Sequence, residues 1–399
     1  MGINSVHRAS LRLPVWLLAI GLLASCGGGG SSDGVDSGGT GVSPFLAAGP
    51  ISGFGSVILN DIRFETSTAS VQDDDGVALS PDQLRLGMTT RIDASDVSIV
   101  GGQATATARA VGVGSELIGP IERIDPLLHV FRVLGQTVFI TPATVFDVNL
   151  AGGFGRLTAG ATVEIHGQFN AATQRYVATR VTPIANPTAY KIRGIASSVD
   201  PVGRTLVVGG LNVSYASLPS SSVPTLTAGQ FVRVRLALQP SAGVWSALSV
   251  AGPPPILDRP RVRLIGRISS WSSSTAFSVN GVPINASAVP GAATNADIAL
   301  GARVFVEGPT SGGVLNATSL FVKGDESLAN TTFELHGLIT AIDVSAQTLV
   351  VRGVNIHYGA STQFQGGLAT DLALGRRVDV IGSLSSDSAG LEAQMIAFE

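Results

Sequence analysis

Residues 205–215 read TLVVGGLNVSY, and residues 348–358, which begin 143 positions later, read TLVVRGVNIHY. Both stretches alternate apolar and polar side chains around a two-residue centre that contains glycine. Alternation with a period of two predicts β-strands, and such a centre predicts a hairpin turn. The near-duplication indicates that the same hairpin occurs at least twice in this chain.

A second motif recurs five times at an almost constant spacing. It is Leu-x-x-Gly, with Ile as the first residue in one copy, followed by alternating apolar residues. Its glycines are 73, 69, 72 and 74 residues apart and are Gly87, Gly160, Gly229, Gly301 and Gly375. A period this regular is typical of tandem structural units. The duplicated stretch is then the same hairpin in the third and fifth units.

Each unit has a hairpin turn upstream of the Leu-x-x-Gly motif. The clearest is Asn280-Gly281, since Asn-Gly between alternating apolar residues is the strongest short hairpin signal. The equivalent turns are Asn60-Asp61, Leu134-Gly135, Gly209-Gly210 and Arg352-Gly353. Five or six short strands in about 70 residues predict a small sandwich or barrel. Five main strands with a short insert after the third favour a barrel of the OB type.

We therefore expect an all-β chain made of five tandem OB-like β-barrels. The predicted ranges are a lipoprotein signal peptide at 1–25, a flexible Gly/Ser-rich tether at 26–48, and repeats 1 to 5 at 49–117, 118–186, 187–253, 254–325 and 326–399. A 70-residue unit buries only about 60% of its unfolded surface, so we expect neighbouring units to dock, in a curved rod.

The first 26 residues have the features of an export signal. Basic residues are followed by an 11-residue apolar run, 13–23, which is too short to span a membrane but suits a signal peptide. The sequence Leu-Ala-Ser-Cys at its end resembles the bacterial lipobox. That resemblance implies cleavage before Cys26, the only cysteine in the chain, and attachment of diacylglycerol and further acyl chains such as palmitate to it.

The lipobox also suggests a cellular location. Two or three acyl chains make a durable anchor, because each buried methylene contributes about 0.8 kcal/mol. Gly27 follows the cysteine where an inner-membrane retention signal would place Asp. We therefore expect a lipid-anchored protein of the bacterial cell envelope, at the outer membrane, on its periplasmic face or at the cell surface.

The repeat pattern resembles a bacterial family of domains of unknown function, which occur as tandem OB-like β-barrel repeats in exported lipoproteins. The shared features are a Gly-x-[ILV] opening strand, a V-x-G-x-x-[VI] hairpin, a Thr-x-Phe segment and the Leu-x-x-Gly strand. The Thr-x-Phe segments are Thr144-Val145-Phe146 and Thr362-Gln363-Phe364. Repeat 1 departs most, because it carries the insert VQDDDGVALS at 71–80. The resemblance implies the fold and the location, and it brings no activity and no catalytic residue.

No residue set predicts catalysis, a cofactor or a metal. Outward positions of the Leu-x-x-Gly strand differ between repeats, for example Glu164, Arg233, Phe305 and Asp379, which argues against a chemical site common to all repeats. Histidines outside the signal lie in different strands or turns, and we interpret them as solvated; they are His129, His166, His336 and His357. The acidic stretch 73–75 is interpreted as a solvated turn, with a calcium site as the alternative.

Nucleic acid is not an expected ligand. The formal net charge is −3, only two lysines are present, and aromatic residues are few and scattered, whereas such sites combine a basic groove with stacking aromatics. The sequence favours a non-catalytic structural or protein-interaction module whose partner is an envelope protein or a polysaccharide. One alternative is a glycan- or peptide-binding protein that uses Trp245 or Trp271 for stacking. A second alternative is a hydrolase with its site in one diverged repeat.

Overall fold

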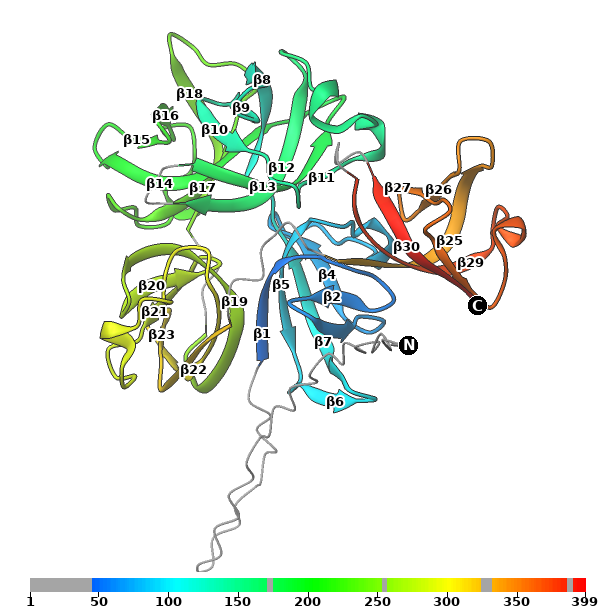
Figure 1. Cartoon of the computed structure of the whole chain (residues 1–399). Coiled ribbons are helices and arrows are strands. Elements are labelled where there is room, and N and C mark those ends of the chain that lie inside the picture. The colour runs from blue at the N-terminus through cyan, green and yellow to red at the C-terminus, as the bar shows by residue number, and fades with distance from the viewer. Residues whose placement is uncertain (1–44, 171–174, 253–256, 324–331, 386–389) are drawn as a thin grey trace, which may run out of the picture. The chain divides into compact units, whose positions relative to one another are not determined.

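The computed structural model describes residues 45–170, 175–252, 257–323, 332–385 and 390–399 (Figure 1). The signal peptide, Cys26 and most of the predicted tether lie outside these residues. The described chain is all-β, as predicted, with single turns of 3-10 helix between strands. None of the helices in this part of the chain has the length and apolar character needed to cross a membrane.

The strands follow one another in the same pattern in each predicted repeat. Repeat 1 contains β1 (Phe45–Pro50), β2 (Val57–Leu59), β3 (Ile62–Glu65), β4 (Ser70–Asp73), η1 (Pro81–Gln83), β5 (Thr89–Ala94), β6 (Ser98–Val100) and β7 (Gln103–Val113). Repeat 2 contains β8 (Leu117–Asp125), β9 (Val130–Val133), β10 (Gln136–Phe139), β11 (Val145–Phe146), η2 (Val148–Leu150), η3 (Gly153–Arg156), β12 (Thr162–Asn170) and β13 (Arg175–Pro183). Repeat 3 contains β14 (Tyr190–Asp200), β15 (Thr205–Val208), β16 (Leu211–Ser214), η4 (Ser220–Ser222), β17 (Phe231–Leu236) and β18 (Val244–Ala251).

The last two repeats continue this order. Repeat 4 contains β19 (Arg259–Ser273), β20 (Ala276–Val279), β21 (Val282–Asn285), η5 (Ala292–Thr294), β22 (Arg303–Ser311), β23 (Val314–Asn316) and β24 (Ser319–Lys323). Repeat 5 contains β25 (Phe333–Asp343), β26 (Thr348–Val351), β27 (Val354–His357), β28 (Gln363–Gln365), η7 (Ala369–Asp371), β29 (Arg377–Leu384) and β30 (Leu391–Phe398).

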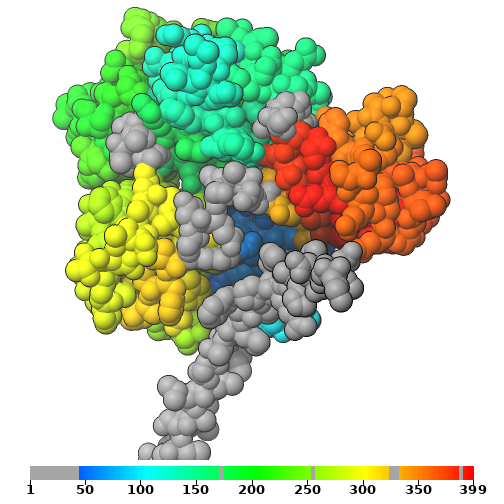
Figure 2. All heavy atoms as spheres, viewed as in Figure 1, coloured from blue at the N-terminus to red at the C-terminus, as the bar shows by residue number. Residues whose placement is uncertain are grey.

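Strand pairing closes small barrels. In repeat 5, β25 pairs with β26, β26 with β27, β27 in parallel with β30, β30 with β29, and β29 back with β25. The corresponding cycles in repeats 2, 3 and 4 also close through ladder pairs. In repeat 1 the isolated bridge between Gly53 and Ile58 completes the cycle. Figure 2 shows the same face with all heavy atoms, and side chains cover the coloured barrels there.

The predicted hairpin turns and Leu-x-x-Gly glycines set the backbone of each barrel. Both turn residues of each predicted hairpin have positive φ, from 47° at Asn280 to 83° at Gly281, as a two-residue type I′ turn requires. The five Leu-x-x-Gly glycines have φ between 77° and 87°. Each donates its N–H, at 2.7 or 2.8 Å, to a carbonyl of the first strand or, in repeat 1, of the residue that directly follows it; the acceptors are Ile51, Ile121, Ala196, Ile268 and Ile339. These bonds attach the fourth main strand to the first.

The last strand of each barrel bends where one residue leaves the ladder. Between β12 and β13, for example, Thr179 is skipped, because His166 pairs with Arg180 and Gly167 with Ala178. A β-bulge of this kind turns the strand around the end of a small barrel. In repeats 2, 4 and 5 a glycine faces this bend, and a Cβ on Gly308 would lie 1.9 Å from the carbonyl oxygen of Asn316.

The repeats bury apolar residues in shared cores. One buried cluster combines residues of repeats 1 and 5, such as Phe64 and Leu335, and a second combines repeats 2 and 3, such as Phe131 and Val234. A third cluster lies mainly within repeat 4. β8 also pairs with β14, which joins the sheets of repeats 2 and 3. The prediction that units dock in order to enlarge their cores therefore holds for this neighbouring pair.

Docking is not limited to neighbours along the chain. β1 of repeat 1 pairs in parallel with β19 of repeat 4, and Gly53 bridges to Glu334 of repeat 5. β1 begins at Phe45, inside the range 26–48 predicted for the tether, because the segment FLAAGP is apolar and buried. The tether prediction was thus too long at its C-terminal end. A row in which each repeat contacts only its neighbours along the chain would not include the pairs β1–β19 and Gly53–Glu334.

Replacement of Gly308 by Ala tests the bend. We expect a loss of about 2 kcal/mol in unfolding free energy, because the added methyl meets a backbone carbonyl that cannot rotate away. The midpoint of urea unfolding measures the change. Gly155→Ala is the control, since a Cβ at Gly155 would meet no atom within 4 Å. Equal midpoints for the two variants would contradict the steric explanation.

Candidate functional site

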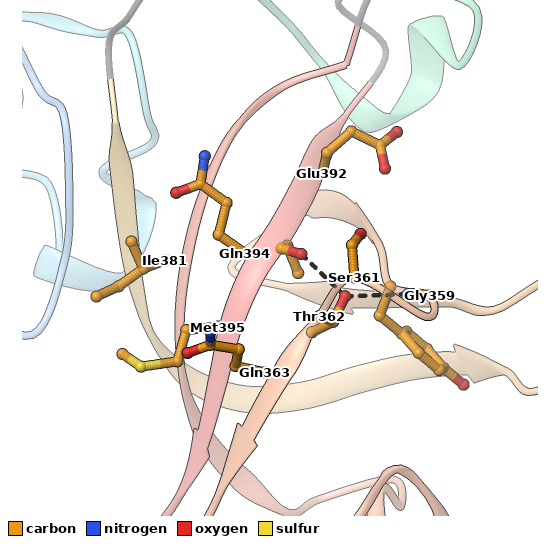
Figure 3. Close-up of a pocket in the computed structure, with 10 residues that line it drawn as sticks. Gly359, Ser361, Thr362, Gln363, Ile381, Glu392, Gln394 and Met395 are labelled. Carbon is orange, nitrogen blue, oxygen red and sulfur yellow. Dashed lines mark hydrogen bonds between the residues drawn. The ribbon is translucent and has the colours of Figure 1, made fainter. Parts of the chain in front are cut away.

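A pocket of about 560 Å³ opens on repeat 5 (Figure 3). Its lining comes partly from the parallel strands β28 and β30 and includes the buried Thr362, which directly precedes β28. The Thr362 hydroxyl donates to the carbonyl of Ala393 at 2.9 Å and accepts the N–H of Gly359 at 3.0 Å. The lining is polar and apolar in about equal measure and also includes Tyr358, Ser361, Gln363, Ile381, Glu392, Gln394 and Met395. This arrangement offers amide and carboxylate groups for hydrogen bonding.

Three possible metal ligands meet elsewhere on repeat 5. The ligand atoms of His336, Asp379 and Glu399 lie within 4.8 Å of one another. His336 Nδ1 is 2.7 Å from an Asp379 oxygen and 3.0 Å from a Glu399 oxygen, so Nδ1 carries the proton and donates. Its Nε2 then accepts from Arg377 at 3.2 Å. Because a guanidinium occupies the free ring nitrogen, the group is a hydrogen-bonded ion cluster with no ring nitrogen left for a cation.

The acidic stretch of repeat 1 lies against basic residues of repeat 3. Asp74 is only 8% exposed and lies 2.9 Å from Lys191, 3.1 Å from Arg193 and 3.3 Å from Arg233. Asp75 is 3.4 Å from Arg233. We call these five residues the ionic junction. The prediction of a solvated turn at 73–75 is wrong for the side chain of Asp74, whereas Asp75 is exposed as predicted, and the surrounding cations oppose the calcium alternative.

Electrostatics at the ionic junction favour an ionised Asp74. Burial acts to raise the pKa of Asp74, but the charges of Lys191, Arg193 and Arg233 outweigh it, and the pKa falls below its ordinary value. Glu116, 3.4 Å from Arg193, is buried, and burial raises its pKa despite that neighbour. The carboxylate of Asp74 is therefore held charged among three cations of repeat 3, which is an arrangement for holding repeats together.

His166 lies at the contact between repeats 1 and 2. The side chain is 2% exposed, with Nδ1 3.3 Å from the N–H of Thr89 and 3.1 Å from the carbonyl of Gly114. Burial lowers its pKa, although Glu164 partly opposes this. His166 is thus buried and not solvated as predicted, whereas His129 is exposed and lies beside Phe154, with ring centroids 5.7 Å apart.

Arg180 makes a second contact between the same repeats. It is 1% exposed, forms an ion pair with Asp147 and donates to the carbonyl of Leu86 in repeat 1 at 3.2 Å. Burial lowers the pKa of Arg180, and Asp147 opposes that shift. A buried guanidinium that bonds a neighbouring backbone fixes the position of one barrel on the other.

The two tryptophans proposed for stacking lie in repeats 3 and 4. Trp245 is partly buried and makes an edge contact with Tyr190, with ring centroids 6.0 Å apart. Trp271 is 43% exposed and donates its indole N–H to the carbonyl of Ile298 at 2.9 Å. Neither lines the pocket of repeat 5, so the structure does not bring the proposed stacking residues to that pocket.

The sequence did not reveal what the scattered outward positions do. His166 and Arg233 contact repeat 1, and Phe305 packs against the core shared by repeats 1 and 5. Glu334 of repeat 5 binds Arg63 of repeat 1 at 2.5 Å. Repeat 1 therefore contacts every other repeat. The feature of the sequence that could have indicated this role of repeat 1 is the insert at 71–80, which is present only in that repeat.

Comparisons with known proteins match parts of the chain to a family of unknown function and give no activity. Residues 118–182, 265–320 and 336–396 match the family described as Domain of unknown function (DUF5666). These segments fall within the ranges predicted for repeats 2, 4 and 5 and together cover less than half of the chain. The match fits the predicted resemblance to a repeat family of unknown function. No curated protein matches the chain.

Replacement of Asp74 by Asn tests the ionic junction. It removes the carboxylate that Lys191, Arg193 and Arg233 share and leaves only Glu116 and Asp75 beside the two arginines, so we expect a loss of about 3 kcal/mol in unfolding free energy. Urea unfolding measures it. The control Asp96→Asn removes a 46% exposed partner of Arg263 and should cost less than about 1 kcal/mol. A loss no larger than that of the control would show that the junction contributes little.

His166 should make stability depend on pH. Because its pKa is lowered in the folded state, its contribution is complete above the unfolded pKa of about 6.5 and is lost as pH falls below that value. The slope approaches about 1.4 kcal/mol per pH unit. We expect His166→Asn to reduce the fall in unfolding midpoint between pH 7.5 and 5.5, and the exposed-site control His129→Asn to retain it. The same fall in all three proteins would refute this assignment.

Proposed function

We propose that this protein is a lipid-anchored lipoprotein of the bacterial cell envelope that acts as a non-catalytic structural or protein-interaction module. In this proposal five OB-like barrels form the folded part, and a short tether joins them to acylated Cys26. The strand cycle first–second–third–fifth–fourth, with the third and fifth strands parallel, is the order of an OB-type barrel. Its recurrence in each predicted range supports the count of five.

The ionic junction carries the proposal that the protein is a module and not an enzyme. Its buried ionisable groups face each other across repeats, so their charges are used for holding barrels together. Arg63–Glu334 and Arg303–Asp61 add contacts from repeat 1 to repeats 5 and 4, at 2.5 and 2.7 Å. Such a framework presents the outer surfaces of several barrels in a defined order, which suits a scaffold for partners.

The pocket of repeat 5 favours a second candidate function. Its amide, hydroxyl and carboxylate groups suit hydrogen bonding to a glycan or an extended peptide. OB-type barrels are known to bind oligosaccharides as well as oligonucleotides. In this case the protein would recognise a cell-wall or surface polysaccharide through repeat 5.

In-cell crosslinking of the full chain, followed by mass spectrometry of attached molecules, separates these candidates. One abundant envelope protein is expected for a scaffold, and recovery of polysaccharide fragments alone would favour the second candidate. Cys26→Ser is the matched variant: it should move the protein from the carbonate-washed membrane pellet to the soluble fraction. Retention of Cys26→Ser in that pellet would refute the lipid anchor.

A further inference from the structure

Three repeats have an extra short strand after their hairpin. These strands are β4, β11 and β28, and each pairs in parallel with the second half of the last strand of its barrel. The partners of β11 are Arg180 and Val181 in β13, and those of β28 are residues 395–397 in β30. The extra strand covers a barrel edge that lies beyond the bulge.

Repeats 3 and 4 have no such strand among the residues that the structure describes. The equivalent edges are residues 249–251 of β18 and the whole of β24. β24 pairs along its full length with β22, and the described residues provide no strand on its other side. An unpaired edge presents backbone N–H and C=O groups that can bind another strand.

The sequence explains why the edge is covered in some repeats and open in others. Thr144 and Thr362 stand five residues after the hairpin and donate their hydroxyls to the carbonyls of Ala178 and Ala393, at 2.7 and 2.9 Å. The same position holds Pro219 in repeat 3 and Pro290 in repeat 4. Proline has neither a hydroxyl nor an N–H for a ladder. In repeat 4 the chain turns instead into η5.

The β24 edge has the features of a binding strand. It is five residues long, and Phe321 at its centre is 66% exposed, with its ring centroid 6.4 Å from that of Phe305. In repeat 2 the carbonyl of Val181 accepts the N–H of Asp147 at 3.0 Å on the side of β11. Leu320 is the equivalent of Val181, so its carbonyl faces the open side of β24.

We propose that β24 binds an extended segment of a partner protein, which adds to repeat 4 as a parallel strand. The segment would carry a Thr-x-Phe pattern, since this chain covers the same edge with Thr144-Val145-Phe146 in repeat 2 and with Thr362-Gln363-Phe364 in repeat 5. The threonine hydroxyl would bond the carbonyl of Ala317, the equivalent of Ala178. Main-chain bonds then supply affinity and Phe321 supplies an aromatic contact. This inference rests on the proposed role as an interaction module.

A labelled peptide tests the binding edge. The probe copies residues 141–149, TPATVFDVN, with a photoreactive group in place of the phenylalanine side chain, and the protein is the full chain. Fluorescence anisotropy should show saturable binding, and irradiation should crosslink the probe to residues 319–323. A control peptide with Pro for the threonine and Ser for the phenylalanine should bind at least ten-fold more weakly. Crosslinks only to β13 or β30 would overturn the proposal, as would absent binding.

A matched pair of variants locates the contact. Phe321→Lys should weaken peptide binding at least ten-fold, whereas Leu374→Lys, at a 68% exposed position of repeat 5, should leave it unchanged. The melting temperature of each variant shows whether it is folded. If Phe321→Lys does not fold, the position of the probe's crosslinks on the unaltered chain still tests the site.

Unchanged affinity in folded Phe321→Lys overturns the proposal. Self-association of the chain that Phe321→Lys abolishes would do the same, because it assigns the edge to a second copy. If the peptide fails to bind while in-cell crosslinking still recovers an envelope protein, this inference fails and the proposed function stands.

Discussion

The hydrogen bond from the Leu-x-x-Gly glycine to the first strand is the constraint on which each barrel depends. It forms where the chain returns from the hairpin and begins the fourth main strand, and it joins Gly87 to Ile51 and Gly301 to Ile268 at 2.8 Å. The glycine needs positive φ there, which an L-residue adopts at a cost of about 1 kcal/mol or more. Closure of the barrel, its core and its outward side chains all follow from that attachment.

Inward and outward residues of these barrels have different tasks. The inward positions of the fourth main strand are apolar in repeats 2 to 5 and fill the cores, as the buried Val163, Val232, Val304 and Val378 show, whereas repeat 1 buries Thr90 at the same position. The outward positions of the same strands hold contacts between repeats, such as that of Arg233 with Asp74. Variation on the outer face is therefore the means by which similar barrels acquire separate docking partners.

Local features of the fold could be predicted from the sequence, because they depend on residues close together in the chain. The hairpins at Asn280-Gly281 and Arg352-Gly353 are examples. The ionic junction could not, since Asp74 and Lys191 are 117 residues apart and pairing of their charges requires a tertiary arrangement. The role of Pro290 became visible only when the partner strand of Thr144 was known.

The ionic junction also limits how a gene for this chain can change by duplication or loss of repeats. Recombination in such a gene would occur between stretches of similar sequence, such as those that encode residues 205–215 and 348–358. Asp74 belongs to an insert found only in repeat 1, however, and its cations belong to repeat 3. Loss of either repeat would leave charged side chains of the other without their partners, so these two repeats are not interchangeable units.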